Sequence, residues 1–200
     1  MIEAPATDVK VTTPALTNQN RVIVLVLIMA SALLFVTGTT IWFLYRAAFA
    51  SISARLVETA QSQARLIEAI SREESTHPEL HGERASEVVL EQLIDAHLAY
   101  RGHGKTSEFT LARREGDLMV FLLGHRHDTV EPPDPVPFGS DRAEPMTAAL
   151  SGRSGTMVGR DYAGHTVLAA FEPARMIDGG ELGVVAKIDL DEVQAPFVTA

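Results

Sequence analysis

One uncharged run constrains this chain more than any other feature of its sequence. It extends from Val22 to Tyr45, 24 residues between Arg21 and Arg46. At about 1.5 Å rise per residue, a helix of this length spans roughly 36 Å, which exceeds the ~30 Å hydrocarbon core of a bilayer. Trp42 and Tyr45 lie near its end, where aromatic rings favour the headgroup level. The run predicts a transmembrane helix over residues 21–46.

A cleaved signal peptide is the alternative interpretation of this run. Ala48–Ala50 ("AFA") has the small residues of a cleavage site. However, the apolar run is about twice as long as the core of a signal peptide, and 21 residues precede it. We therefore favour a membrane anchor that stays attached.

Charge narrows the range of partners. Residues 1–21 are neutral, whereas residues 46–200 carry 15 basic and 24 acidic side chains and hold the whole net charge of −9. Nucleic-acid affinity depends on neutralising phosphates, so we expect no nucleic-acid partner and no binding to anionic lipid surfaces. The chain has no cysteine, which excludes disulfides, thiolate metal sites and cysteine nucleophiles. Basic residues flank the apolar run on both sides, so charge alone does not orient the anchor.

The pattern of apolar residues on either side of this run distinguishes a polar tail from a second helix. Residues 1–20 are polar and are expected to be a disordered cytoplasmic tail. A long juxtamembrane helix is predicted over 47–75 from apolar residues at three- and four-residue steps. This stripe packs on the chain's own domain, forms the seam of a dimer, or does each along a different part of the helix. Its members are Phe49, Ile52, Leu56, Ala60, Gln63, Ile67 and Ile70.

Residues 76–190 predict an α+β domain. A second helix is expected to begin at Ser86, and a hairpin is expected over 108–114 and 118–124, with its second strand covered on both faces. A proline-rich loop follows, then a short helix with Gly152 as its C-cap, two strands and a last strand over 182–189. The order indicates a PAS-like five-stranded antiparallel sheet with helices on one face. Residues 190–200 predict an exit helix toward a second, missing membrane span.

No catalytic constellation stands out. Ser154 in "SGRSG" lacks the spacing and the strand-to-helix context of a nucleophile elbow, so a helix-terminating turn is favoured. The histidine pairs His125/His127 and His77/His81 offer too few ligands for a metal site. No phosphate-binding glycine loop is present. We therefore predict no catalytic residue, no metal and no cofactor in this segment, and leave open whether the full-length protein is an enzyme.

A ligand pocket between the sheet and the proline-rich loop is the remaining hypothesis. Its candidate polar residues are Arg126, Arg160, Asp161, Tyr162 and Lys187. Lys187 lies among apolar neighbours in the last strand, so its ammonium either reaches solvent or meets an anionic group.

The order of elements and one stretch resemble a known family. "ALSGRSGTMVGRDYAGHTVLAAFEPARMIDGGELGVVAKIDLDEVQAPF" is similar to the C-terminal half of the Cache-type sensor domains of bacterial transmembrane receptors. The matching positions are Ser151–Gly155, Asp161, Gly164, Val167–Pro173 and Val184–Asp189. The arginine–tryptophan–aspartate set of amino-acid-binding double Cache domains is missing, so a single Cache domain fits better.

The resemblance implies a periplasmic sensor in the inner membrane of a bacterium, sensing a small organic ligand as a homodimer. Its cytoplasmic effector, absent here, would be a histidine kinase rather than a nucleotide or diguanylate cyclase or a chemoreceptor module. The alternative is a membrane-anchored interaction or adaptor module whose PAS-like domain binds another protein. An anchored hydrolase is the least favoured class.

Overall fold

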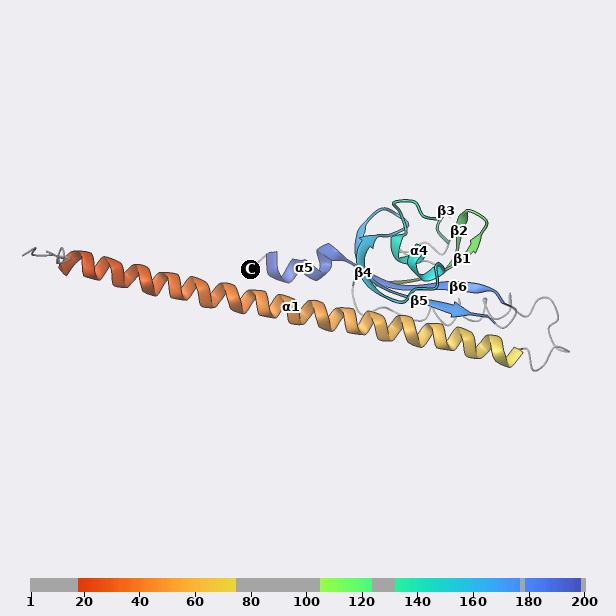
Figure 1. The fold of residues 1–200 in the computed structure, drawn as a ribbon, viewed down its shortest axis with the longest axis horizontal. Coiled ribbons are helices and arrows are strands. Elements are labelled where there is room, and N and C mark those ends of the chain that lie inside the picture. The colour runs from red at the N-terminus through yellow and green to blue at the C-terminus, as the bar shows by residue number, and fades with distance from the viewer. Residues whose placement is uncertain (1–17, 75–104, 124–131, 177–178, 199–200) are drawn as a thin grey trace, which may run out of the picture. The chain divides into compact units, whose positions relative to one another are not determined.

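A computed structural model describes residues 18–74, 105–123, 132–176 and 179–198 (Figure 1). The chain divides into two compact units, one ending at Leu44 and one from Tyr45 onward. The expected tail at 1–20 lies almost wholly outside the described residues, as do the expected helix from Ser86 and most of the proline-rich loop before Pro132.

The first unit contributes the N-terminal part of helix α1 (Asn18–Glu74). Its apolar side chains are exposed, from Val22 at 60 % to Phe43 at 69 %. In the part of the chain that the structure describes, α1 is the one helix long and apolar enough to cross a membrane. The expected anchor and juxtamembrane segments therefore form a single helix.

The second unit is built on a curled antiparallel sheet of six strands in the order β3-β2-β1-β6-β5-β4. A hairpin joins β1 (Glu108–Glu115) to β2 (Leu118–Leu123), and Gly116 adopts the positive φ of +60° that its turn requires. The remaining strands are β3 (Val136–Pro137), β4 (Gly155–Arg160), β5 (Thr166–Arg175) and β6 (Glu181–Asp189). Five of these strands were expected; β3 is the additional one, a two-residue strand within the proline-rich stretch.

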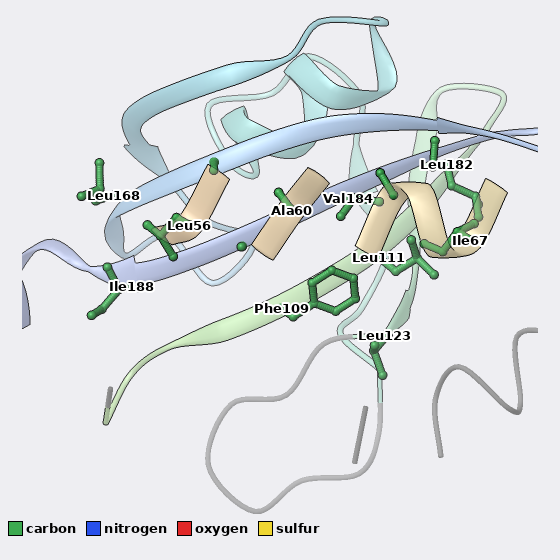
Figure 2. Close-up of a cluster of buried hydrophobic side chains, with 14 of the residues drawn as sticks. Leu56, Ala60, Ile67, Phe109, Leu111, Leu123, Leu168, Leu182, Val184 and Ile188 are labelled. Carbon is green, nitrogen blue, oxygen red and sulfur yellow. The ribbon is translucent and has the colours of Figure 1, made fainter. Parts of the chain in front are cut away.

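One face of the sheet packs against α1, and we call it the α1 face. Leu56, Ala60, Ala64 and Ile67 of α1 are buried there at helical spacing. Figure 2 shows that the α1 side chains lie among strand residues such as Leu111, Val184 and Ile188. The predicted stripe thus packs on the chain's own domain, one of the possibilities that the sequence left open.

The other face packs against helix α4 (Glu144–Leu150), and we call it the α4 face. Met146, Ala149 and Leu150 of α4 cluster with Val185 of β6 and Phe171 of β5. The prediction of helices on one face was wrong, because helices cover both faces of the described sheet. Ser151, not the expected Gly152, is the C-cap of α4. Gly152 follows it with φ +74°, and its N–H donates to the Ala149 carbonyl at 2.9 Å.

Coverage of β2 is less complete than predicted. Met119, Phe121 and Leu123 are buried, whereas Val120 and Leu122 are half-buried and Leu118 is exposed. After β6, the predicted exit helix is present as α5 (Leu190–Val198), with Asp191 and Glu192 in its first turn.

Candidate functional site

A buried ion-pair cluster occupies the α4 face where β1 and β6 pair. Glu108, the first residue of β1, lies directly opposite Lys187 of β6. The Lys187 ammonium lies 2.7 Å from Oε2 of Glu108 and 2.5 Å from Oδ2 of Asp161. The side chains of all three residues are at most 3 % exposed. The Lys187 ammonium therefore does not reach solvent, and the anionic groups that it meets are carboxylates of the chain itself. A contact between Lys187 and a ligand stays a prediction.

The turn between β4 and β5 places the Asp161 carboxylate. Oδ1 of Asp161 accepts hydrogen bonds from the N–H groups of Ala163 at 2.9 Å and His165 at 2.8 Å. The Asp161 N–H donates to the His165 carbonyl, which closes the turn, and Gly164 supplies a φ of +90° within it. One carboxylate oxygen thus organises the turn while the other contacts Lys187.

Tyr162 completes the cluster. Its hydroxyl donates to Oε1 of Glu108 at 2.6 Å, and its ring centroid lies 4.2 Å from the Lys187 ammonium. Phe121 of β2 holds the ring from the side, with centroids 5.3 Å apart. The Arg142 guanidinium donates to the Tyr162 carbonyl through both Nε and a terminal nitrogen, which ties this turn to the segment before α4.

The polar groups of the cluster are paired with one another. Each oxygen of Glu108 has a donor, and the Lys187 ammonium contacts two carboxylates and one ring. Such satisfied buried pairs are costly to break, because removing one partner leaves an uncompensated charge in a medium of low polarity.

Three of the five predicted ligand residues come together in this cluster: Asp161, Tyr162 and Lys187. Arg160 does not join them. Its side chain is 56 % exposed and pairs with Asp141 at 3.4 Å. Arg126 lies outside the described residues.

Glu108 is the member of the cluster that sequence reasoning missed. The strand period of two could have indicated that Glu108 is buried, because it places Glu108 on the same strand face as Thr110 and Ala112. Both of these residues are buried. The partner of that glutamate could not be deduced, because the register of β1 on β6 is a long-range property.

A second polar constellation lies at the same strand ends, where β6 passes into α5. Glu192 accepts hydrogen bonds from the N–H of Lys105 at 2.9 Å, the N–H of Thr106 at 2.8 Å and the Thr106 hydroxyl at 2.6 Å. Burial by itself would raise the pKa of Glu192. The hydrogen bonds from Thr106 and Lys105, together with the positive charge of Lys105, outweigh burial and hold the pKa below its usual value.

Two features that the sequence analysis discounted are the histidine pairs and Ser154. In the ranges it describes, no three metal-ligating side chains gather, and the pairs His125/His127 and His77/His81 lie outside those ranges. Ser154 is exposed in the turn after α4 and lines a hollow of about 110 Å³ between α1 and the β4–β5 edge. Glu172 is the one carboxylate among the residues that line this hollow.

No protein-family model matches the chain, and no curated protein matches it in sequence.

Proposed function

We propose that this chain is the extracytoplasmic input domain of a membrane-bound signalling receptor. The observation that carries the proposal is the meeting of α1 and α5. The rings of Tyr45 and Phe197 lie 5.3 Å apart in an edge-to-face contact. Tyr45 is the last residue of the uncharged run, so α5 returns to the level at which the proposed membrane span ends. A domain inserted between two such helices can pass a change in its sheet to both of them.

The resemblance to single Cache domains supports the same proposal. In this proposal the domain is periplasmic, the anchor lies in the inner membrane of a bacterium, and α5 leads to a second span and a cytoplasmic effector. A histidine kinase is favoured over a cyclase or a chemoreceptor module. A small organic ligand would bind on the α4 face beside Lys187, Asp161 and Tyr162.

The proposed homodimer draws no support from the α1 stripe, which is buried against the chain's own sheet. Elsewhere on its surface, α1 exposes the charged residues Arg55, Glu58 and Arg65. In a parallel pair identical residues of this surface would face each other, so like charges would meet. Pairing would therefore rest on other surfaces.

The test measures both the binding of a small ligand and the signalling output that follows it. The full chain in detergent micelles is titrated calorimetrically with a panel of small carboxylic acids. In parallel, residues 1–200 are fused to the second span and kinase core of a characterised receptor, with a phosphorylation-dependent reporter. We expect at least one acid to bind and to change reporter output, and Lys187→Gln to abolish both responses.

Arg160→Gln is the matched control, because Arg160 was an equal candidate by sequence but lies outside the cluster. It should bind and respond like the parent chain. A panel without any binder, together with a fusion whose output ignores both the panel and Lys187→Gln, would contradict the proposal.

An interaction module is the second candidate, and one observation favours it. Strand β4 is a terminal strand of the sheet, and Val158 on it is 47 % exposed. A partner could add a strand there. Protection of β4 amides from hydrogen exchange on mixing with cell extract, without any small-molecule response, would favour this alternative.

A further inference from the structure

Helix α5 is fastened to two strands. It continues β6 through the peptide bond between Asp189 and Leu190. It is also held to the segment that begins β1, because Glu192 in its first turn accepts the Thr106 hydroxyl and two backbone N–H groups. α5 is therefore connected to the start of β1 as well as to the end of β6.

Thr106 lies at the centre of this arrangement. Its hydroxyl donates to Glu192 at 2.6 Å and accepts from the Asp189 N–H at 3.0 Å. A hydroxyl can donate once and accept as well, so both of its roles are in use. Valine at this position would keep the shape and lose both bonds.

The charge cluster lies close by on the same two strands. Glu108, the first residue of β1, comes two residues after Thr106, and Lys187 comes two residues before Asp189 on β6. Two residues of strand span roughly 7 Å. If a change in the Glu108–Lys187 pairing shifts β1 along β6, the shift would therefore move Thr106 relative to Asp189, because no loop separates these residues from the pair.

We infer that Thr106 and Glu192 form a joint through which the Lys187–Glu108–Asp161 cluster sets the position of α5. Both are positioning residues, because the hydrogen bonds between them hold α5 and do not involve the Lys187 ammonium. This inference rests on the proposed function only in taking α5 as the output helix. The joint itself can be tested without a ligand or an effector.

The test uses the absence of cysteine from the chain. Cysteines replace Tyr45 and Phe197, whose rings are in contact, in the full chain in lipid nanodiscs. The initial rate of disulfide formation then reports where α5 lies relative to α1. Glu108→Gln perturbs the cluster while keeping its shape, and we expect it to change the rate about fivefold, the usual scale of coupling between sites.

Coupling through Thr106 predicts that this effect is not additive. In a Thr106→Val background, Glu108→Gln should change the rate less than about 1.5-fold, while Thr106→Ser, which keeps the hydroxyl, should restore the response. An equal effect of Glu108→Gln in both backgrounds would overturn the joint, because the signal would then travel through β6 alone.

Hydrogen exchange gives a second readout that needs no cross-link. Thr106→Val or Glu192→Gln should speed exchange of the α5 amides about tenfold, the scale expected for losing a charge-assisted hydrogen bond. Asp191→Asn is the control, because it removes a charge from the same turn without touching Thr106, and it should stay within about twofold. If all three variants exchange alike, α5 is held only by its peptide link and packing. Circular dichroism confirms that each variant is folded.

Discussion

Lys187 shows how one residue can be both a deeply buried charge and the best functional candidate in a chain. Its ammonium contacts Glu108 and Asp161 at 2.7 and 2.5 Å, with each side chain at most 3 % exposed. Lys187→Met would leave two buried carboxylates without their cation. We expect a loss of about 3–5 kcal/mol in the free energy of unfolding, measured by urea titration.

Arg160→Met is the matched control for this prediction. Arg160 also pairs with an aspartate, but at 3.4 Å and with both side chains more than half exposed. Its loss should cost less than about 1 kcal/mol. Similar costs for the two variants would show that the Lys187 cluster is solvated, contrary to its burial.

Sequence reasoning could select Lys187, Asp161 and Tyr162 but could not show that they meet. Lys187 was selected because it interrupts an apolar strand, and Asp161 and Tyr162 because they lie at a strand end near the proline-rich loop. Glu108 was missed, since its contact depends on how β1 pairs with β6, a strand far along the sequence. Arg160 lies outside the cluster, because adjacent positions at a strand end can face different surroundings.

At the scale of elements, the contact between β6 and α4 depends on Gly183. A Cβ built there would lie 2.5 Å from Sδ of Met146, 3.0 Å from Cγ of Leu150 and 3.2 Å from Cβ of Ala149. Gly183→Ala should therefore destabilise the domain by about 1–3 kcal/mol in urea titration. In a Met146→Ala background, where the closest atom is gone, Gly183→Ala should lower the free energy of unfolding by less. An unchanged loss would mean that the added methyl group does not clash with α4.

The start of α5 should carry a pH-dependent share of stability. The pKa of Glu192 is lower in the folded chain than its ordinary value of 4.5. A carboxyl of this kind stabilises the fold above its unfolded pKa, and this contribution is lost as pH falls through the folded pKa. Glu192→Gln should thus cost about 1–2 kcal/mol at pH 7 and much less near pH 3, by urea titration at both pH values.

Asp191→Asn serves as the control for this pH dependence, because Asp191 is an exposed neighbour in the same helical turn. It should cost less than about 0.5 kcal/mol at pH 7. A Glu192→Gln cost that does not change between pH 7 and pH 3 would contradict the role assigned to its hydrogen bonds.

The elements were more predictable than their arrangement in the whole molecule. Turn residues such as Gly116 and Gly152 marked the ends of elements, the second to within one residue, because their backbone conformations are local. The faces that helices cover were not predictable, since α1 and α4 both carry apolar stripes and either could have packed on the same side. The short strand β3 was missed because two residues show no periodicity.

At the scale of the whole molecule, the second unit should fold without the uncharged run. Both clusters of buried residues draw their members from Leu56 to Val193, with partly buried residues from Phe49 onward. A chain that starts at Tyr45 should therefore unfold at the same urea midpoint as the full chain, within the error of the titration. A midpoint shifted by more than about 1 M would mean that the first unit contributes to the core.

The same pair of chains tests the proposed anchor and its orientation. The full chain should remain in the membrane fraction after alkaline carbonate extraction, because leaving the membrane would expose the apolar side chains of the uncharged run to water. The chain from Tyr45 lacks this run and should be soluble. Thr156→Cys places a single thiol at an exposed position of β4 in a chain without cysteine. A membrane-impermeant maleimide should label it in intact spheroplasts if the domain is periplasmic. Labelling only after lysis would place the domain in the cytoplasm and contradict an extracytoplasmic sensor.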